Sequence, residues 1–206
     1  MSWTEKLADR LAAKLVTEDT PYTRGQIAHG LEIVLLQLLN LVFLLVVSYL
    51  LDVFGEALVV AVVYTLHRNF TGGVHFKSQS ACFYIGNALL IGAALLVKYL
   101  PPLADAAAYG LVLSVFALSF ALNRRYAPAK HTYVEYDESI IKRNRTIVGR
   151  LLVFGCLFSL VLVYFSYSKL AFSYTVAVLL QSILLHPFSY RLVGGIEQIF
   201  YKGVDP

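Results

Sequence analysis

The chain has 206 residues, of which 58% are hydrophobic and 15% are charged, and its formal net charge is +4. Soluble domains usually hold about 45–50% apolar and about 25% charged residues, so this composition excludes an ordinary soluble protein and indicates a membrane protein. The length suits one domain over residues 1–206 and leaves no room for a separate soluble one. The excess of cations does not predict nucleic-acid binding, because Lys and Arg gather between apolar runs, where they set membrane topology.

Residues 1–20 predict an amphipathic helix ahead of the bundle. An apolar stripe and a basic stripe repeat along it, namely Trp3, Leu7, Leu11 and Leu15, and Lys6, Arg10 and Lys14. Such a helix suits a membrane surface with anionic headgroups. Packing against the protein's own cytoplasmic side is an equal alternative. The charged N-terminus has no apolar core of a signal peptide, so we expect no cleavable signal.

Six apolar runs follow, and each is a candidate membrane span. They cover residues 27–51, 53–66, 81–97, 103–122, 147–167 and 170–185. The second would rise only about 21 Å, less than a hydrocarbon core of about 30 Å. The sequence therefore predicts an all-α, polytopic integral membrane protein with a bundle over residues 27–189. The segment after the second span is expected to be non-helical or re-entrant, and buried in protein or against a wet cavity.

The distribution of cations predicts the orientation of the bundle. Most lie in the N-terminal segment, in two alternate connections and in the C-terminal tail, namely Lys6, Arg10, Lys14, Arg24, Arg68, Lys77, Arg124, Arg125, Lys130, Lys142, Arg143, Arg145, Arg191 and Lys202. The other connections hold few, among them Lys98 and Lys169. The positive-inside rule then places both termini and the 68–82 stretch on the cytoplasmic side.

The stretch RNFTGGVHFKSQSAC, residues 68–82, gathers reactive side chains between two apolar runs. His75 and Cys82 are the only imidazole and thiol close in sequence, and an imidazole is a common device for turning a thiol into a nucleophilic thiolate. Cys82 also falls at the predicted start of a helix, whose positive end favours the thiolate. The pair predicts a cysteine–histidine hydrolase or acyl-transfer enzyme.

A working dyad requires the backbone to turn within residues 74–81. A straight helix over residues 75–82 would separate the two side chains by about 10.5 Å along its axis. Gly72 and Gly73 supply bending just before, since glycine accepts backbone angles that other residues avoid. Ser78 and its polar neighbours are expected to satisfy exposed backbone groups in the turn.

Each of these residues also has a plainer interpretation. A lone membrane histidine or cysteine is more often a packed side chain, and Arg68 would serve as a headgroup anchor. A zinc site from His67, His75 and Cys82 lacks a fourth ligand, so we expect no metal and no other cofactor. Cys156 lies inside an apolar run and is predicted to act as a small hydrophobic side chain.

The pattern R-x3-GG-x-H-x6-C, read on Arg68, Gly72, Gly73, His75 and Cys82, resembles the signature of the accessory gene regulator B (AgrB) family. Members are membrane-embedded cysteine endopeptidases that process quorum-sensing peptide precursors. The YAPAK segment (126–130) and the KRNR segment (142–145) resemble the family's later cytoplasmic loop. The similarity covers essentially the whole chain. The stretch between those two segments is more acidic than the family pattern, through Glu135, Asp137 and Glu138.

The resemblance implies a defined reaction in a bacterial cell membrane. His75 would take the thiol proton, and Cys82 would attack a backbone carbonyl of an AgrD-like precursor peptide. The C-terminal part would leave, and a cysteine or serine of the remaining peptide would resolve the thioester into a thiolactone or lactone ring. A protected pocket and the high effective concentration of the internal nucleophile suit this step. The family also implies a homodimer.

Several other residues are candidates for binding the precursor or stabilising the transition state. Arg68 would hold a precursor carboxylate or orient the loop, and backbone N–H groups near Gly73 or at the following helix start would bind the oxyanion. Lys142, Arg143 and Arg145 would attract the acidic C-terminal region of the precursor, or only set topology.

The group that orients His75 is unassigned. Glu32, Gln37 and Asn40 are candidates by position, and hydrogen bonding between helices is their commoner role. A small transporter or channel with a polar cytoplasmic gate is the alternative function, and a membrane scaffold is a third. Transport would spread paired polar residues over the middle of several spans, whereas here they gather in one segment, which favours an enzyme.

Overall fold

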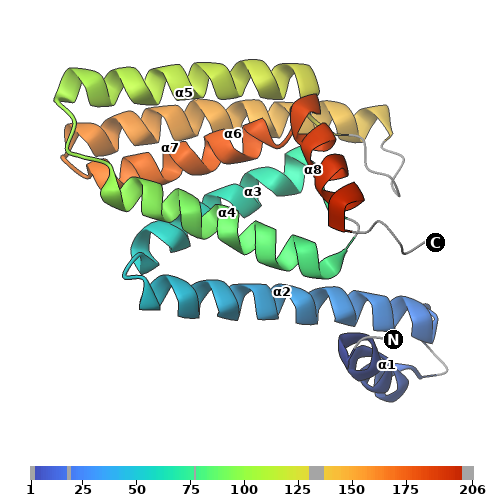
Figure 1. The fold of residues 1–206 in the computed structure, drawn as a ribbon. Helices are drawn as coiled ribbons and strands as arrows, with labels where there is room; N and C mark the ends of the chain where they lie inside the picture. Colours follow the sequence, from blue (N-terminus) through green and yellow to red (C-terminus); the bar gives the residue numbers. More distant parts are fainter. Residues whose placement is uncertain (1–2, 18–19, 77, 130–136, 201–206) are drawn as a thin grey trace. The chain divides into compact units, whose positions relative to one another are not determined.

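The computed structural model describes residues 3–17, 20–76, 78–129 and 137–200, and the regular structure in them is entirely helical (Figure 1). The helices are α1 (Trp3–Leu15), α2 (Arg24–Leu50), α3 (Phe54–Thr71), α4 (Gln79–Tyr99), α5 (Asp105–Tyr126), α6 (Glu138–Tyr164), α7 (Ser168–Ile183) and α8 (Pro187–Phe200). The all-α prediction is confirmed. Four residues used in the sequence analysis, Lys77, Lys130, Glu135 and Lys202, lie outside the described ranges.

The chain forms two units, Met1–Val47 and Ser48–Pro206. In the first, α1 packs through small side chains: Thr4, Ala8 and Ala12. Thr4 Oγ1 donates to Glu32 Oε1 at 3.3 Å. The apolar stripe lies elsewhere on α1 and is exposed, with 62% of Trp3 accessible. That stripe is therefore available to a lipid surface, as the interfacial interpretation requires, and the interfacial helix itself stays a prediction.

Among the described residues, four helices are long and apolar enough to cross a membrane: α2, α4, α5 and α6. α7 and α8 together raise the number to five, as one pair bent by 74°. The helix of the predicted second span, α3, is not among them, since its 18 residues include polar His67, Arg68 and Asn69 near the C-terminal end. A multi-pass arrangement with four to five spans is thus supported, and the six predicted spans remain a prediction.

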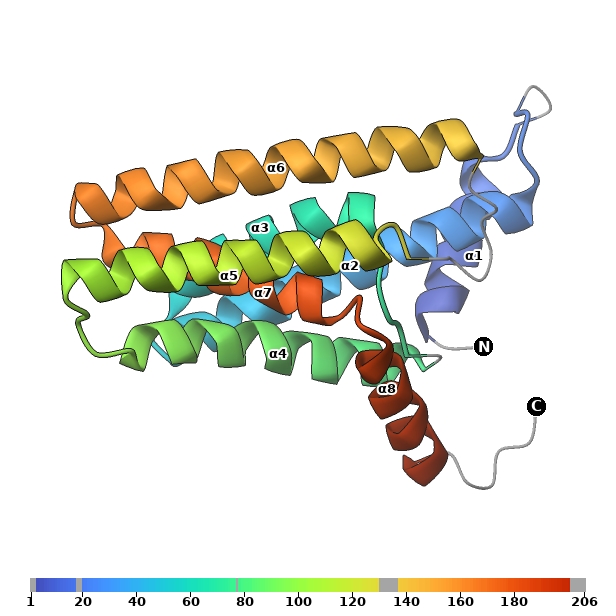
Figure 2. The ribbon, with the colours of Figure 1, turned by 90° about the horizontal axis from the view of Figure 1, so that it is seen from above.

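In the second unit α7 is the central helix and packs on α3, α4, α5 and α6 (Figures 1 and 2). Nine of its sixteen residues are buried, many of them small or polar. At one crossing α6 approaches so closely that a Cβ on Gly155 would lie 2.5 Å from the ring of Tyr174. Such close contact lets polar groups meet within the bundle, as they do at the end of α7 described below.

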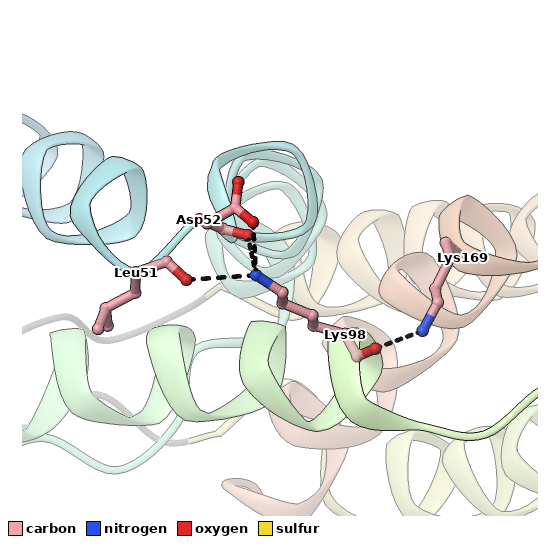
Figure 3. Close-up of polar contacts among 4 residues, drawn as sticks. All are labelled: Leu51, Asp52, Lys98 and Lys169. Atoms are coloured by element: carbon pink, nitrogen blue, oxygen red, sulfur yellow. Dashed lines mark hydrogen bonds and ion pairs between the residues drawn. The ribbon is translucent and has the colours of Figure 1, made fainter.

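Two lysines hold the loops at the end of the second unit where α4 stops (Figure 3). Lys98 Nζ donates to the backbone oxygen of Asp52 at 2.6 Å and to its carboxylate at 2.8 Å. Lys169 Nζ donates to the carbonyls of Val97 at 2.7 Å and of Lys98 at 2.6 Å. A cation at a helix C-terminus satisfies carbonyls that have no partner within the helix. These two cations are therefore structural, which accounts for their place away from the cation-rich connections.

The Asp52–Lys98 pair predicts a small acid sensitivity. The hydrogen bond from Lys98, and then its charge, hold the pKa of the Asp52 carboxyl below its ordinary value. The pair's stabilisation is thus present above the unfolded pKa of about 3.9 and is lost as pH falls through the lower folded value. The effect is small, because the carboxylate is exposed and screened. We expect Asp52→Asn to lower the melting temperature more at pH 6 than at pH 2, by thermal unfolding in detergent; an equal difference at both pH values would contradict this.

Candidate functional site

The helical path breaks where the sequence predicts a turn. α3 ends at Thr71, α4 begins at Gln79, and residues 72–76 lie outside any helix. Gly72 has φ +67° and ψ −145°, and Gly73 has φ +137°. Residues with a Cβ rarely adopt these angles. The expectation that residues 75–82 do not form one straight helix is confirmed.

The start of α4 places Cys82 in its first turn. Ser78 caps the helix, since its Oγ accepts a hydrogen bond from the Ala81 N–H at 3.3 Å and its carbonyl accepts one from the Cys82 N–H at 3.0 Å. The Cys82 Sγ is partly accessible and lies 3.8 Å from the carbonyl oxygen of Phe76. The thiol thus sits at the positive end of a helix dipole, and it reaches back to the residue that follows His75.

His75 is exposed and lies against the guanidinium of Arg68. One terminal nitrogen of Arg68 is 3.2 Å from Nδ1 and 3.0 Å from Nε2 of the ring. The same nitrogen donates to the Val74 carbonyl at 2.7 Å, and the other donates to the Tyr64 hydroxyl at 2.8 Å. A guanidinium only donates, so a ring nitrogen that accepts from it carries a lone pair, as a general base must. Of the two roles open to Arg68, these contacts favour orienting the loop.

His67 has a different environment from His75. Its side chain is 1% exposed, inside the bundle. Within the part of the chain that the structure describes, no three His, Cys, Asp or Glu side chains gather as metal ligands. The zinc alternative built on His67, His75 and Cys82 therefore has no geometric support.

Gln181, which the sequence analysis did not single out, forms hydrogen bonds from the bundle interior to the residues where α3 ends and the non-helical segment begins. Its side chain is 1% exposed, and its Nε2 donates to Thr71 Oγ1 at 2.7 Å and to the Gly72 carbonyl at 2.6 Å. Nearby, the Val74 N–H donates to the Leu184 carbonyl at 3.3 Å. The end of α7 thus fixes the backbone on both sides of Gly73. The one sequence signal was a polar residue inside an apolar run, which tends to face the protein interior.

The connection between α5 and α6 also borders the segment. The Ala129 N–H donates to the Thr71 carbonyl at 2.8 Å, and Arg145 Nε donates to the Ala127 carbonyl at 3.1 Å. Lys142 and Arg143 are exposed in the first turns of α6. The structure therefore brings Arg68, Gly72, Gly73 and His75 together and joins Arg145 to the neighbouring connection.

The orienting candidates on α2 belong to the first unit. There Glu32 accepts the hydrogen bond from Thr4, and Asn40 Nδ2 donates to the Leu36 carbonyl of its own helix at 3.0 Å. Gln37 is exposed. These contacts of Glu32 and Asn40 are structural, whereas Arg68 contacts the imidazole of His75.

Gly73 is predicted to tolerate no side chain. A Cβ there would lie 3.2 Å from the Arg68 guanidinium and 3.5 Å from Gln181 Nε2, on a backbone that L residues rarely adopt. We expect Gly73→Ala to destabilise the protein by about 1–3 kcal/mol and to change the rate at which iodoacetamide alkylates Cys82. Gly110→Ala is the matched control, because a Cβ there meets nothing within 4 Å. Equal melting temperatures and alkylation rates for both variants would contradict the prediction.

The comparisons with known proteins agree with the resemblance read on residues 68–82. A family model described as Accessory gene regulator B matches residues 4–185. The matched range holds the break between α3 and α4 together with Gln181. No curated protein and no solved structure matches the chain.

Proposed function

Because the chain belongs to the accessory gene regulator B family, whose members process peptide precursors, we propose that it is a membrane-embedded cysteine endopeptidase and peptide cyclase. One observation carries the proposal: the chain leaves its helical path at Gly72 and re-enters a helix at Gln79, with His75 on the non-helical segment and Cys82 in the first helical turn. The accessible thiol and the imidazole held by Arg68 are the two groups that the chemistry requires.

The first half of the reaction breaks a peptide bond. His75 takes the proton of the Cys82 thiol, and the sulfur attacks a backbone carbonyl carbon of the bound precursor. The tetrahedral intermediate collapses to a thioester on Cys82, and the peptide nitrogen leaves as an amine with the proton from His75. The Gly73 N–H donates to no described residue, so we assign it to the oxyanion, together with the N-terminal turn of α4.

The second half closes a ring. A thiol or hydroxyl within the bound peptide attacks the thioester carbonyl, and the sulfur of Cys82 leaves and recovers a proton. The product is a thiolactone or lactone macrocycle. An internal nucleophile wins over water because its effective concentration is high, provided that the site limits access of water to the thioester.

The substrate proposed is an AgrD-like precursor with an acidic C-terminal region. Lys142, Arg143 and Arg145 are exposed on the first turns of α6, next to the connection that contacts Thr71. We propose that they attract the acidic region by long-range charge. In the proposed setting the protein is a homodimer in a bacterial cell membrane, with both termini and the site on the cytoplasmic side.

The test is to trap the acyl-enzyme. Purified protein in lipid is given a precursor whose ring-forming cysteine or serine is replaced by alanine, so that ring closure is impossible. We expect the N-terminal peptide fragment to accumulate on Cys82, to be located there by peptide mass mapping and to be released by hydroxylamine, which cleaves thioesters. Cleavage of the precursor with no adduct at Cys82, or with the adduct on another residue, would overturn the proposal.

A further inference from the structure

α5 and α6 run side by side (Figure 2), and residues of both helices line a groove. It consists of two adjoining hollows that share Phe120, Arg145 and Gly149, and the more enclosed of them measures about 360 Å³. A Cβ on Gly149 would meet nothing within 4 Å, so the missing side chain leaves space for an occupant. The groove lies apart from His75 and Cys82, which do not line it.

The groove carries positive charge at the end where α5 stops and α6 starts. Arg124, Arg145 and Arg150 line it and are exposed. Among the described residues no carboxylate pairs with any of them. Arg145 uses its Nε on the Ala127 carbonyl, which leaves its terminal nitrogens for an anion. Arg150 lies about 7.5 Å further along the axis, inside the apolar helix, where an unneutralised guanidinium is costly.

The rest of the groove is apolar. Phe120 of α5 and Val153, Phe154 and Leu157 of α6 line it, and all four are exposed. From Arg145 to Leu157 the helix rises about 18 Å, close to the roughly 15 Å of hydrocarbon in one leaflet. The lining outside the arginines offers few polar groups, so it suits a hydrocarbon chain better than a peptide backbone.

We propose that this groove binds one anionic diacyl phospholipid. The phosphate lies between Arg145 and Arg150, with Arg124 at the rim, where guanidinium pairs are well suited to phosphate oxygens. An acyl chain follows Phe120 and Phe154 into the space above Gly149. Charge complementarity favours a phospholipid over a second copy of the chain. A second copy would have to place an anionic group between Arg145 and Arg150, where the lipid phosphate would lie. This proposal does not rest on the peptidase activity, because lipid retention is measured without a precursor peptide.

The test measures lipid selectivity on the full-length protein in detergent. Equimolar phosphatidylglycerol and phosphatidylcholine with identical acyl chains are added, and native mass spectrometry counts which lipid is retained. We expect retention of phosphatidylglycerol over phosphatidylcholine. Removal of each cation should reduce this preference about fivefold, so that Arg145→Gln with Arg150→Gln reduces it about 25-fold. Gly149→Leu, which fills the groove and keeps the arginines, should displace both lipids.

Both matched controls lie on α5, the other helix that lines the groove. Arg125→Gln removes a neighbouring cation that contacts the ring of Tyr126 and does not line the groove. Gly110→Leu makes the same glycine change where a Cβ also meets open space. An unchanged preference in the double arginine variant, or an equal loss in Arg125→Gln, would overturn the proposal. A Gly149→Leu variant that changes oligomeric state while lipid retention stays the same would assign the groove to a second copy instead. If Gly149→Leu fails to fold, the arginine variants decide alone.

Discussion

Replacing Cys82 by alanine is expected to abolish cleavage of the precursor, and His75→Ala is expected to slow it by about 10²–10⁴-fold. The first change removes the atom that bonds to the scissile carbonyl, so no residual route through a thioester exists. The second removes the proton acceptor and donor, whose contribution in such reactions is about 10²–10⁴-fold. The measurement is the amount of C-terminal fragment released from the precursor by purified protein in lipid, followed by mass spectrometry.

Controls separate loss of chemistry from loss of fold. Cys156→Ala removes the other cysteine, which packs against the apolar core within α6, and His29→Ala removes an exposed imidazole of α2. Both are expected to cleave as the unchanged protein does. All four variants should also give the same elution profile and melting temperature within a few degrees. Normal cleavage by Cys82→Ala would leave the transporter or scaffold interpretation in place.

Gln181→Leu is predicted to slow cleavage by about 10- to 100-fold, although Gln181 is not a catalytic residue. The change removes both hydrogen bonds from Nε2 and leaves the buried Thr71 hydroxyl and the Gly72 carbonyl without this donor, which costs about 1–3 kcal/mol of stability. The freed segment then displaces His75, and a displacement near 1 Å at a reacting group is worth about 100-fold in rate. Leucine has a similar volume, so packing around α7 changes little.

Two readouts identify Gln181 as a positioning residue. A displaced segment lowers kcat more than it changes KM, because Gln181 itself is buried away from the substrate. It also shifts the pH profile of Cys82 alkylation by iodoacetamide, which requires no precursor. Ser159→Ala is the control, since this buried hydroxyl of α6 has no described partner. If Gln181→Leu lowers the melting temperature with both readouts unchanged, Gln181 supports only the fold.

Patterns among residues close in sequence predicted much of the fold of this protein. Hydropathy predicted helices close to those observed: the run 81–97 lies within α4, and the run 103–122 begins two residues before α5 and ends inside it. The break before α4 followed from Gly72 and Gly73 and from the reach of a straight helix. These features can be predicted from the sequence because each depends on residues only a few positions apart. The physical causes are backbone angles, helical rise and the transfer of apolar side chains out of water.

Long-range contacts decided the rest. Hydropathy predicted a short span over residues 53–66 and a span over residues 170–185. It did not indicate that α7 is the central helix of the second unit, nor that α7 is long enough to cross a membrane only together with α8. Thr71, which accepts a hydrogen bond from Gln181, lies 110 residues earlier in the chain. The periodicity of a sequence does not predict which polar groups meet between distant helices. The sequence by itself determined where a thiol, an imidazole and a turn occur; only the tertiary structure decided what holds them, because hydrogen bonds between distant helices depend on how those helices pack.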